Sequence, residues 1–560
     1  MVYERRSLQE LQALYDAGDH LPLDKLVKAL RHIQSLPADD EDSFHKIGGY
    51  HGEPFRYNTA PPDRTGDWWG GYCFHSCVLF PTWHRAYMLR LENSLRKVEG
   101  CEDVTLPFWD ECFGMNEKSP QLPVIPSILT SPMYTIETET FDNPLYSFKL
   151  KACLIDKTVG NENRYTKKAG YETVRYPLSG LVGTDEDARS TEIHNSRYTD
   201  ATTRATILNG NVANWLSTGP IIPDDGHGTK PPSDTTSVYK RYAHCLTAPS
   251  YTIFSNTTSQ QKVMINKAQN ENEASWLMSL ESPHNAIHLA VGGFYQQGAM
   301  NADPIIGANG DMGDNETAGF DPIFFLHHCF IDYVFWQWQV QHDAKDTLII
   351  DEKDEGAKVP KGGILNLPEG TSLTMDTPLP PFLKPGYTTP GTNNENCYTS
   401  RDMVNIEKLG YKYGKGSLDP ALAAPSPYLP NPIKQMVKVS NIKRAKYKGS
   451  FVIRTYAKNP DSESHPWIEI GREPVLSRWN VNNCANCQNH LDAMSVIALD
   501  DVLINHLLGP DWASQGRSVK EIQYLVEIHS HDKGKRLFTP TPGMDDDQPT
   551  LEHLIDNETL

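Results

Sequence analysis

Four histidines in the second half of the chain have the types and spacing of metal ligands. His284 and His288, in ESPHNAIH, are four positions apart, so on a helix both imidazoles project from one face and can bind one ion. A chance pair on a solvated helix face is the alternative for so short a motif. The adjacent pair His327 and His328 follows in FDPIFFLHHCFID, an almost wholly apolar pattern that predicts a buried helix.

The adjacent pair needs partners, because an unpaired polar group inside a protein costs ~1–3 kcal/mol. Neighbouring helical residues point about 100° apart, so His327 and His328 are not expected to bind the same ion. We expect one to be a metal ligand and the other a core histidine.

A second cluster lies earlier in the chain. His51 occurs in GGYHGEPF, and His75 and His84 occur in CFHSCVLFPTWHRAY, where His84 falls one turn into a predicted helix. Neither cluster has a carboxylate in its immediate pattern, and sets of neutral imidazoles suit copper rather than Ca²⁺ or Mg²⁺. A structural zinc protein is the alternative, but two such sets on buried helices favour a pair of metal ions.

The combined pattern resembles the type 3 copper proteins, specifically the tyrosinase and catechol oxidase family. The matching segments are HGEPF, YCFHSCVLFPTWHRAY, LPFWD, SLESPHNAIH, GGF and FDPIFFLHHCFID, in that order over roughly residues 45–340. The resemblance to fungal pro-tyrosinases implies two copper ions, CuA and CuB, that bind O₂ as co-substrate. It places CuA on His51, His75 and His84, and CuB on His284, His288 and His328.

The resemblance also decides between the adjacent histidines and adds a covalent link. The family's last ligand lies four residues before an acidic residue, here Asp332, which selects His328 and leaves His327 beside the ligands. Cys73, two positions before His75, matches the cysteine that forms a thioether with that histidine in several members; an ordinary buried cysteine is the alternative.

The family reaction is ortho-hydroxylation of monophenols and oxidation of o-diphenols to o-quinones. Glu281 and Asn285 match residues that hold a proton-accepting water in tyrosinases, which favours a tyrosinase over a catechol oxidase acting on o-diphenols only. A helix-start carboxylate and a capping amide are the alternatives for the two. Asn315 matches the residue that gates CuB. A hemocyanin-like oxygen carrier is the alternative outside enzymes.

The elements around these motifs predict a mainly α catalytic domain, a helical bundle with long loops, followed by a smaller β-rich domain. Residues 1–110 and 260–345 have helical patterns, whereas 112–260 indicate long loops with short helices. Tyr411-Lys412-Tyr413 resembles the motif that ends the family's catalytic domain and packs against an N-terminal arginine, for which Arg5 and Arg6 are candidates.

The domain limits follow from composition. We expect a catalytic domain over 1–416, a proline-rich linker over 417–435, and a covering domain over 436–560 with alternating, strand-like runs. The resemblance implies a latent proenzyme that an activating protease opens at the linker. Val475, Leu476 and Trp479 are candidates to fill the substrate pocket, and Cys484 and Cys487 form a CxxC that resembles a copper-delivery motif.

Composition limits the partners. The 560 residues carry 52 Lys and Arg against 71 Asp and Glu, a formal charge of −19. Such a chain repels phosphate backbones and anionic lipid, so we expect no nucleic-acid and no membrane partner. The resemblance implies small phenols and catechols as partners, besides the activating protease. Ten cysteines without a disulfide-like spacing favour the cytoplasm. A homo-oligomer is compatible with the sequence.

Overall fold

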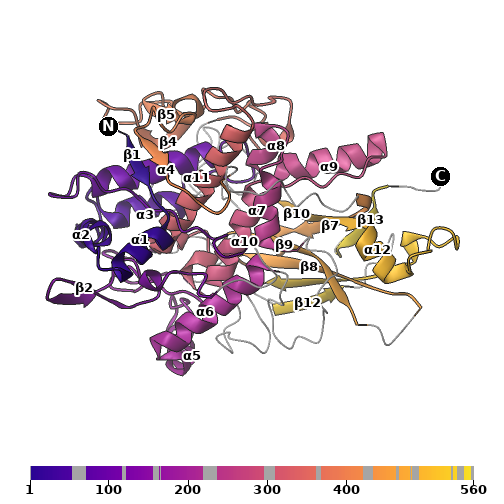
Figure 1. The fold of residues 1–560 in the computed structure, drawn as a ribbon, viewed down its shortest axis with the longest axis horizontal. Helices are drawn as coiled ribbons and strands as arrows, with labels where there is room; N and C mark the ends of the chain where they lie inside the picture. Colours follow the sequence, from indigo (N-terminus) through magenta and orange to yellow (C-terminus); the bar gives the residue numbers. More distant parts are fainter. Residues whose placement is uncertain are drawn as a thin grey trace.

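The computed structural model describes residues 2–52, 71–115, 122–155, 163, 166–217, 236–294, 310–360, 367–419, 433–461, 466–479, 481, 491–530, 534–538 and 548–555. It has two parts, which Figure 1 shows side by side: a helical body, coloured from indigo through magenta to orange, and a β-rich domain, coloured orange to yellow. None of the described helices has the length and apolar character that a bilayer span requires.

The body is built from helices joined by long connections. Its helices are α1 (Leu8–Asp16), α2 (Leu21–Ser35), α3 (Phe44–Gly52), α4 (Phe80–Leu95), α5 (Asp185–Asn195), α6 (Ala201–Leu216), α7 (Val238–Cys245), α8 (Tyr251–Ser255), α9 (Thr257–Glu271), α10 (Glu281–Gly292) and α11 (Ile323–Gln341). Short strands accompany them: β1 (Tyr3–Arg5), β2 (Met133–Ile136), β3 (Glu139–Asp142), β4 (Pro378–Leu383), β5 (Cys397–Thr399) and β6 (Tyr411–Tyr413).

Local signals start several of these helices. The Ser7 side chain accepts a hydrogen bond from the Glu10 amide at the start of α1, as expected from the sequence. The expectation of only short helices within 112–260 was wrong for α6, which has 16 residues. Its Thr- and Asn-rich sequence has weak helix propensity, and packing compensates: α6 lies against α10, and Asn211 donates to the Ala290 carbonyl at 2.7 Å.

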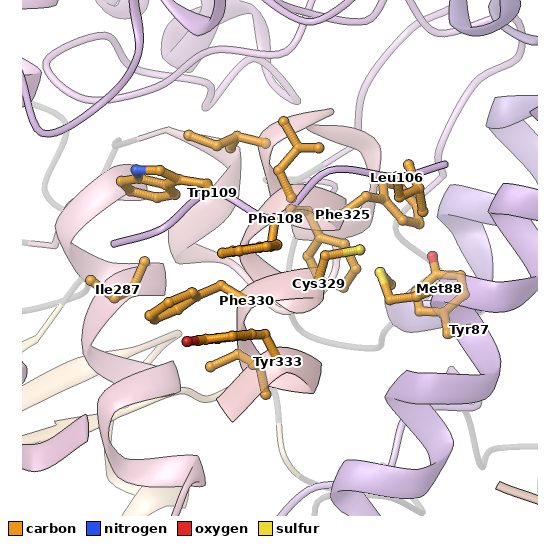
Figure 2. Packing of buried hydrophobic residues seen from close by; sticks show 14 of the residues in the cluster. Tyr87, Met88, Leu106, Phe108, Trp109, Ile287, Phe325, Cys329, Phe330 and Tyr333 are labelled. Carbon is orange, nitrogen blue, oxygen red and sulfur yellow. The ribbon is translucent and has the colours of Figure 1, made fainter. Parts of the chain in front are cut away.

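Helix α11 forms the centre of the body because it is apolar on every side. Figure 2 shows Phe330 and Tyr333 of this helix layered with Phe108. The Phe108 and Tyr333 rings are parallel, with their centroids 4.7 Å apart. Figure 2 also shows Phe325 and Cys329 of α11 facing Tyr87 and Met88 of α4. This continuous core holds the helices that carry the candidate ligands in fixed positions.

The ends of the body are joined by a parallel pairing of β1 with β6. The guanidinium of Arg5 lies 3.6 Å from the centroid of the Tyr411 ring and also bonds the hydroxyl of Tyr413. Of the two arginines considered, Arg5 therefore contacts the Tyr-x-Tyr motif, and Arg6 pairs with Glu10 on the surface.

The C-terminal domain contains two antiparallel sheets. Its elements are β7 (Ile433–Lys443), β8 (Phe451–Lys458), β9 (Ile468–Val475), β10 (Asp492–Asp500), α12 (Asp501–Leu508), β11 (Gln523–Ser530), β12 (Gly534–Phe538) and β13 (Thr550–His553). One sheet has the order β12-β11-β8-β9 and the other β10-β7-β13. The predicted fold class, a helical catalytic domain with a smaller β-rich domain, is confirmed. The exact domain limits stay a prediction, because residues 420–432 lie outside the described chain.

Candidate metal centre

Four helices and one loop bring the six predicted ligands together. His51 ends α3, His84 lies on α4, and His328 lies on α11. His284 and His288 occupy one face of α10, as their spacing predicted. His75 lies in the connection before α4 and is half-buried, whereas the other five are buried.

The six rings form one continuous cluster. Neighbouring centroids within the predicted CuA set lie 5.2 to 5.6 Å apart, and those within the CuB set 4.6 to 5.7 Å. The two sets meet where the rings of His84 and His328 stack at 4.4 Å. Donor atoms of His284, His288, His327 and His328 lie within 4.8 Å of one another, as do those of His51, His84 and His328. The division into two sets of three therefore stays a prediction.

Main-chain carbonyls fix the orientation of three of these rings. The Nδ1 atom of His84 bonds Phe80 O at 2.8 Å, that of His288 bonds Met312 O at 2.8 Å, and that of His51 bonds Asn315 O at 3.2 Å. A carbonyl only accepts, so Nδ1 carries the proton and Nε2 keeps its lone pair. Those buried Nε2 atoms have no hydrogen-bond partner among the described residues, which is the arrangement that metal-ligating histidines adopt.

The side chain of Asn285 orients a fourth ring, that of His284. Asn285 Oδ1 lies 2.9 Å from His284 Nδ1, which again leaves the buried Nε2 of His284 without a partner in the described part of the chain. Asn285 thus orients a ligand directly, a role that sequence reasoning did not assign to it. Its predicted part in proton transfer stays a prediction.

The two adjacent histidines differ in their partners. His327 Nδ1 lies 2.5 Å from Glu111 Oε1, and the Tyr242 hydroxyl donates to the other oxygen of Glu111 at 2.5 Å. Neither nitrogen of His328 has a hydrogen-bond partner within the described ranges. The predicted choice of His328 as ligand is favoured by this difference, although His327 Nε2 also faces the cluster. Glu111 was not singled out from the sequence, although it directly follows the LPFWD segment.

Burial keeps the imidazoles neutral. It is the main cause that lowers the pKa of His84 and His288 to about 3, and the pKa values of His51, His75, His284 and His328 are also lowered by burial and by neighbouring histidines. Neutral, buried and oriented nitrogens fit copper, because a metal has no competition from protons at these donors.

Glu281 has a different environment from the one expected. It is buried, and its two oxygens accept from the Ser76 amide at 2.7 Å and from the amide and hydroxyl of Thr257 at 3.0 Å. Burial raises its pKa, and these donors oppose that shift. Glu281 therefore ties α10 to the loop beside His75. Its predicted role in holding a water stays a prediction.

Asn315 and Cys73 lie at the site. Asn315 is 8% exposed, and its Oδ1 has no hydrogen-bond partner among the described residues, so an amide beside the cluster is available to another group. The sulfur of Cys73 lies within 4.8 Å of donor atoms of His51 and His75. The thioether stays a prediction. Cys484 and Cys487 lie outside the described residues.

The C-terminal domain contacts this centre through a residue that the sequence did not reveal. Arg478 is 1% exposed; its guanidinium donates to Gly52 O at 2.6 Å and lies 3.7 Å from the Cys73 sulfur. The amide of the next residue, Trp479, donates to Glu316 at 3.1 Å. Sequence reasoning considered only apolar residues of this loop, and the arginine between Ser477 and Trp479 was the overlooked signal.

Comparison with known proteins identifies the family. The common central domain of tyrosinase matches residues 41–341. The chain is 43% identical over 542 residues to tyrosinase HcTyr2 from Hahella sp., covering 95% of this chain and 92% of that protein. It is 37% identical over 566 residues to a tyrosinase from Aspergillus oryzae, covering 96% and 95%.

The fold agrees. The structure of the tyrosinase from Burkholderia thailandensis at low pH superposes with a TM-score of 0.76 at 39% identity, covering 98% of this chain and all of that one. The matched region contains all six candidate ligands, and the similarity extends through the C-terminal domain. The chain belongs to the tyrosinase family.

Proposed function

We propose that this chain is a latent copper-dependent phenol oxidase that hydroxylates monophenols ortho to their hydroxyl group and oxidises o-diphenols to o-quinones with O₂. One observation carries the proposal: six neutral histidines form one continuous cluster, and four of them are anchored through Nδ1, which leaves a buried Nε2 without a partner among the described residues.

The residues would hold two copper ions, which supply O₂ binding and electron transfer when bound. His51, His75 and His84 would hold one ion, and His284, His288 and His328 the other. The Nδ1 partners prevent each anchored ring from rotating, so the ligand geometry is set before the metal arrives. The apolar surroundings exclude water that would otherwise compete for the metal.

Proton transfer separates the two candidate activities. Phenols have a pKa near 10, so hydroxylation of a monophenol at neutral pH needs a proton acceptor more than oxidation of a catechol does. Asn285 and Glu281 are proposed to serve this step through a shared water. If Asn285 only orients His284, the activity would be that of a catechol oxidase.

Latency is supported by Arg478 and Trp479, which place the C-terminal domain against the CuA side of the cluster. A domain in that position restricts access by a phenol until a protease cuts the linker over 417–435. The proposal also includes the cytoplasmic location and the homo-oligomeric state that were expected from the sequence.

Copper-loaded, full-length protein tests the proposal. The expected results are two copper ions per chain, an absorption band on oxygenation, and slow turnover of tyrosine and catechol that rises after cleavage within 420–432. A carrier would bind O₂ and turn over neither substrate after cleavage, and a zinc protein would show no oxygenation band.

A further inference from the structure

One short segment lies between the two halves of the centre. Residues 311–316 pass the ends of α3 and α10, the helices that carry His51 and His288. The contacts are close: a Cβ built on Gly52 would lie 1.8 Å from Asn315 O, and one built on Gly292 would lie 1.8 Å from Gly313 N. Any side chain at either glycine would displace the segment.

The segment orients one ligand of each predicted set. The Met312 carbonyl bonds His288 Nδ1, and the Asn315 carbonyl bonds His51 Nδ1, three residues later. A shift of this backbone would therefore release both imidazoles at once. In contrast, the acceptors for His84 and His284 lie on the same helices as the histidines themselves.

Asp311 anchors the start of the segment. Its Oδ2 accepts from the Tyr171 hydroxyl and from the Val174 amide, each at 2.8 Å. Its Oδ1 lies 3.2 Å from Lys167 Nζ, and both side chains are at most 5% exposed. Lys167 also donates to Gly180 O at 2.5 Å and lies 4.3 Å from the centroid of the Tyr171 ring.

We propose that the buried Lys167–Asp311 ion pair positions residues 311–316 so that the Met312 and Asn315 carbonyls orient a ligand of each copper ion. Lys167 and Asp311 are positioning residues: neither side chain has a contact with the histidines. The inference rests on the copper centre of the proposed function. It adds that a single ion pair, whose two residues lie outside the ligand-bearing helices, controls the affinity of both half-sites.

The physical reason is that Asp311 cannot keep its place without a cation. A buried carboxylate that loses its ion-pair partner becomes costly, and the backbone moves or admits water to relieve that cost. The nearest backbone that can move is the ligand-orienting segment itself. Loss of partners that orient ligating histidines lowers metal affinity by about 10- to 100-fold in other proteins.

The test measures copper affinity by competition with a chelator, in Lys167→Met and Asp311→Asn variants of the full-length protein. We expect both copper ions to bind about 10-fold more weakly or worse in Lys167→Met, and to be lost together as chelator is added. Asp311→Asn keeps an acceptor for Tyr171 and Val174, so the loss should be smaller and again shared by both ions. If Lys167→Met does not fold, the copper affinity of Asp311→Asn tests the proposal.

Lys149→Met is the matched control, because Lys149 pairs with Asp142 on the surface and lies 52% exposed. It should retain both ions with the affinity of the unmodified protein. The melting temperature of each metal-free variant is recorded in parallel. Normal copper affinity despite a lowered melting temperature, or loss of one ion only, overturns the proposal. Absence of copper binding in the unmodified protein would instead refute the proposed function.

Discussion

The body and the C-terminal domain each contain a buried carboxylate between two arginines. In the body, Asp332 accepts from Arg85 at 2.5 Å and from Arg5 at 3.2 Å. The hydroxyls of Tyr411 and Tyr413 each donate to it at 2.6 Å. In the C-terminal domain, Glu469 accepts from Arg454 at 3.0 Å and from Arg472 at 2.8 Å.

The two carboxylate–arginine triads, Asp332 with Arg5 and Arg85 and Glu469 with Arg454 and Arg472, differ in the parts of the molecule that they join. Asp332 lies on α11, one turn after His328, and its partners come from both ends of the body, so that triad belongs to a unit that never has to separate. Arg472 faces the other part of the molecule: its carbonyl accepts from Arg241 on α7, and its guanidinium lies 5.5 Å from the centroid of the Trp215 ring on α6.

The boundary between the parts combines apolar and charged contacts. Val452 is the C-terminal residue that joins the apolar core of the body, and a small cluster around Met264 and Met436 adds a second apolar contact. Charged groups also cross the boundary: Arg478 donates to Gly52 O, and Arg241 donates to Arg472 O. Charged groups regain hydration when an interface opens, whereas an apolar core does not. We infer that the body is a permanent unit and that the charged contacts would allow the boundary to open, as the proposed latency requires.

The substitutions with the largest expected effect test whether the body stays folded without its metal ions. His84→Ala or His288→Ala should abolish the oxygenation band while the metal-free protein keeps a nearly normal melting temperature, because the remaining helices still pack. Copper content and absorption after oxygenation measure this. Two ions per chain with normal turnover in either variant would contradict the ligand assignment.

Cleavage within 420–432 tests whether the boundary opens. Catechol turnover by copper-loaded protein should rise at least about 10-fold, which corresponds to a free-energy barrier about 1.4 kcal/mol lower for substrate entry. Turnover before and after limited proteolysis measures it. A high rate in the intact protein that cleavage does not change would rule out a covering domain.

Matched substitutions in the two triads should have opposite effects on activity. Each removes the carboxylate that two buried arginines share, a loss of at most about 3–5 kcal/mol, because Arg5 still pairs with Glu92 and Arg454 lies 3.8 Å from Glu527. Asp332→Asn should lower copper retention and catechol turnover, because α11 loses its anchor. Glu469→Gln should raise the turnover of the uncleaved protein, because the covering domain loosens.

Turnover and copper content of both variants, before and after cleavage, measure the contrast. After cleavage, the Glu469→Gln protein should match the cleaved unmodified protein. Equal losses from both substitutions would mean that the two parts form one cooperative unit.

Arg478→Ala should have a smaller effect at the boundary itself. It removes the contacts with Gly52 and Cys73, so turnover of the uncleaved protein should rise a few-fold, which corresponds to the ~1 kcal/mol net contribution of a typical hydrogen bond. Arg517→Ala is the control, because Arg517 pairs with Asp461 and Glu521 within the C-terminal domain. An unchanged rate in Arg478→Ala would mean that this side chain does not hold the domain in place.

The smallest expected effect is a difference in the pH at which the two domains loosen in acid. Burial raises the pKa of both triad carboxyls, but the arginines outweigh it, so the pKa of Glu469 and that of Asp332 lie below their ordinary values of 4.5 and 3.8. The stability that each contributes is complete above its ordinary value and is lost as the pH falls below it. Glu469 begins to lose its contribution at the higher pH, so the C-terminal domain should loosen first.

Asp314 and Glu316 of the body and Glu473 of the C-terminal domain, whose pKa values burial raises to about 7, take up their protons in the folded protein first. Each therefore opposes the acid loosening of its own domain until the unfolded chain is also protonated near the ordinary pKa. Hydrogen exchange of the two domains between pH 5 and about pH 3 tests the expected order, and earlier loosening of the body would contradict it.

The sequence alone determined the family, the fold class and the residue types of the centre. The i, i+4 spacing of His284 and His288 and the apolar α11 pattern are local signals, and local signals fix which face a helical side chain occupies. The Tyr-x-Tyr motif likewise predicted an arginine contact, but the choice of Arg5 over Arg6 required the β1–β6 pairing.

The tertiary structure alone decided which groups orient the ligands and which seal the boundary. Glu111 with His327, Met312 with His288, and Arg478 with Gly52 are pairs separated by 24 to 426 positions. No local period encodes such pairs, because they depend on how the helices and the C-terminal sheet pack. Hydrogen-bond geometry at a buried nitrogen is set by the backbone that packs beside it, and that backbone is placed by the whole fold.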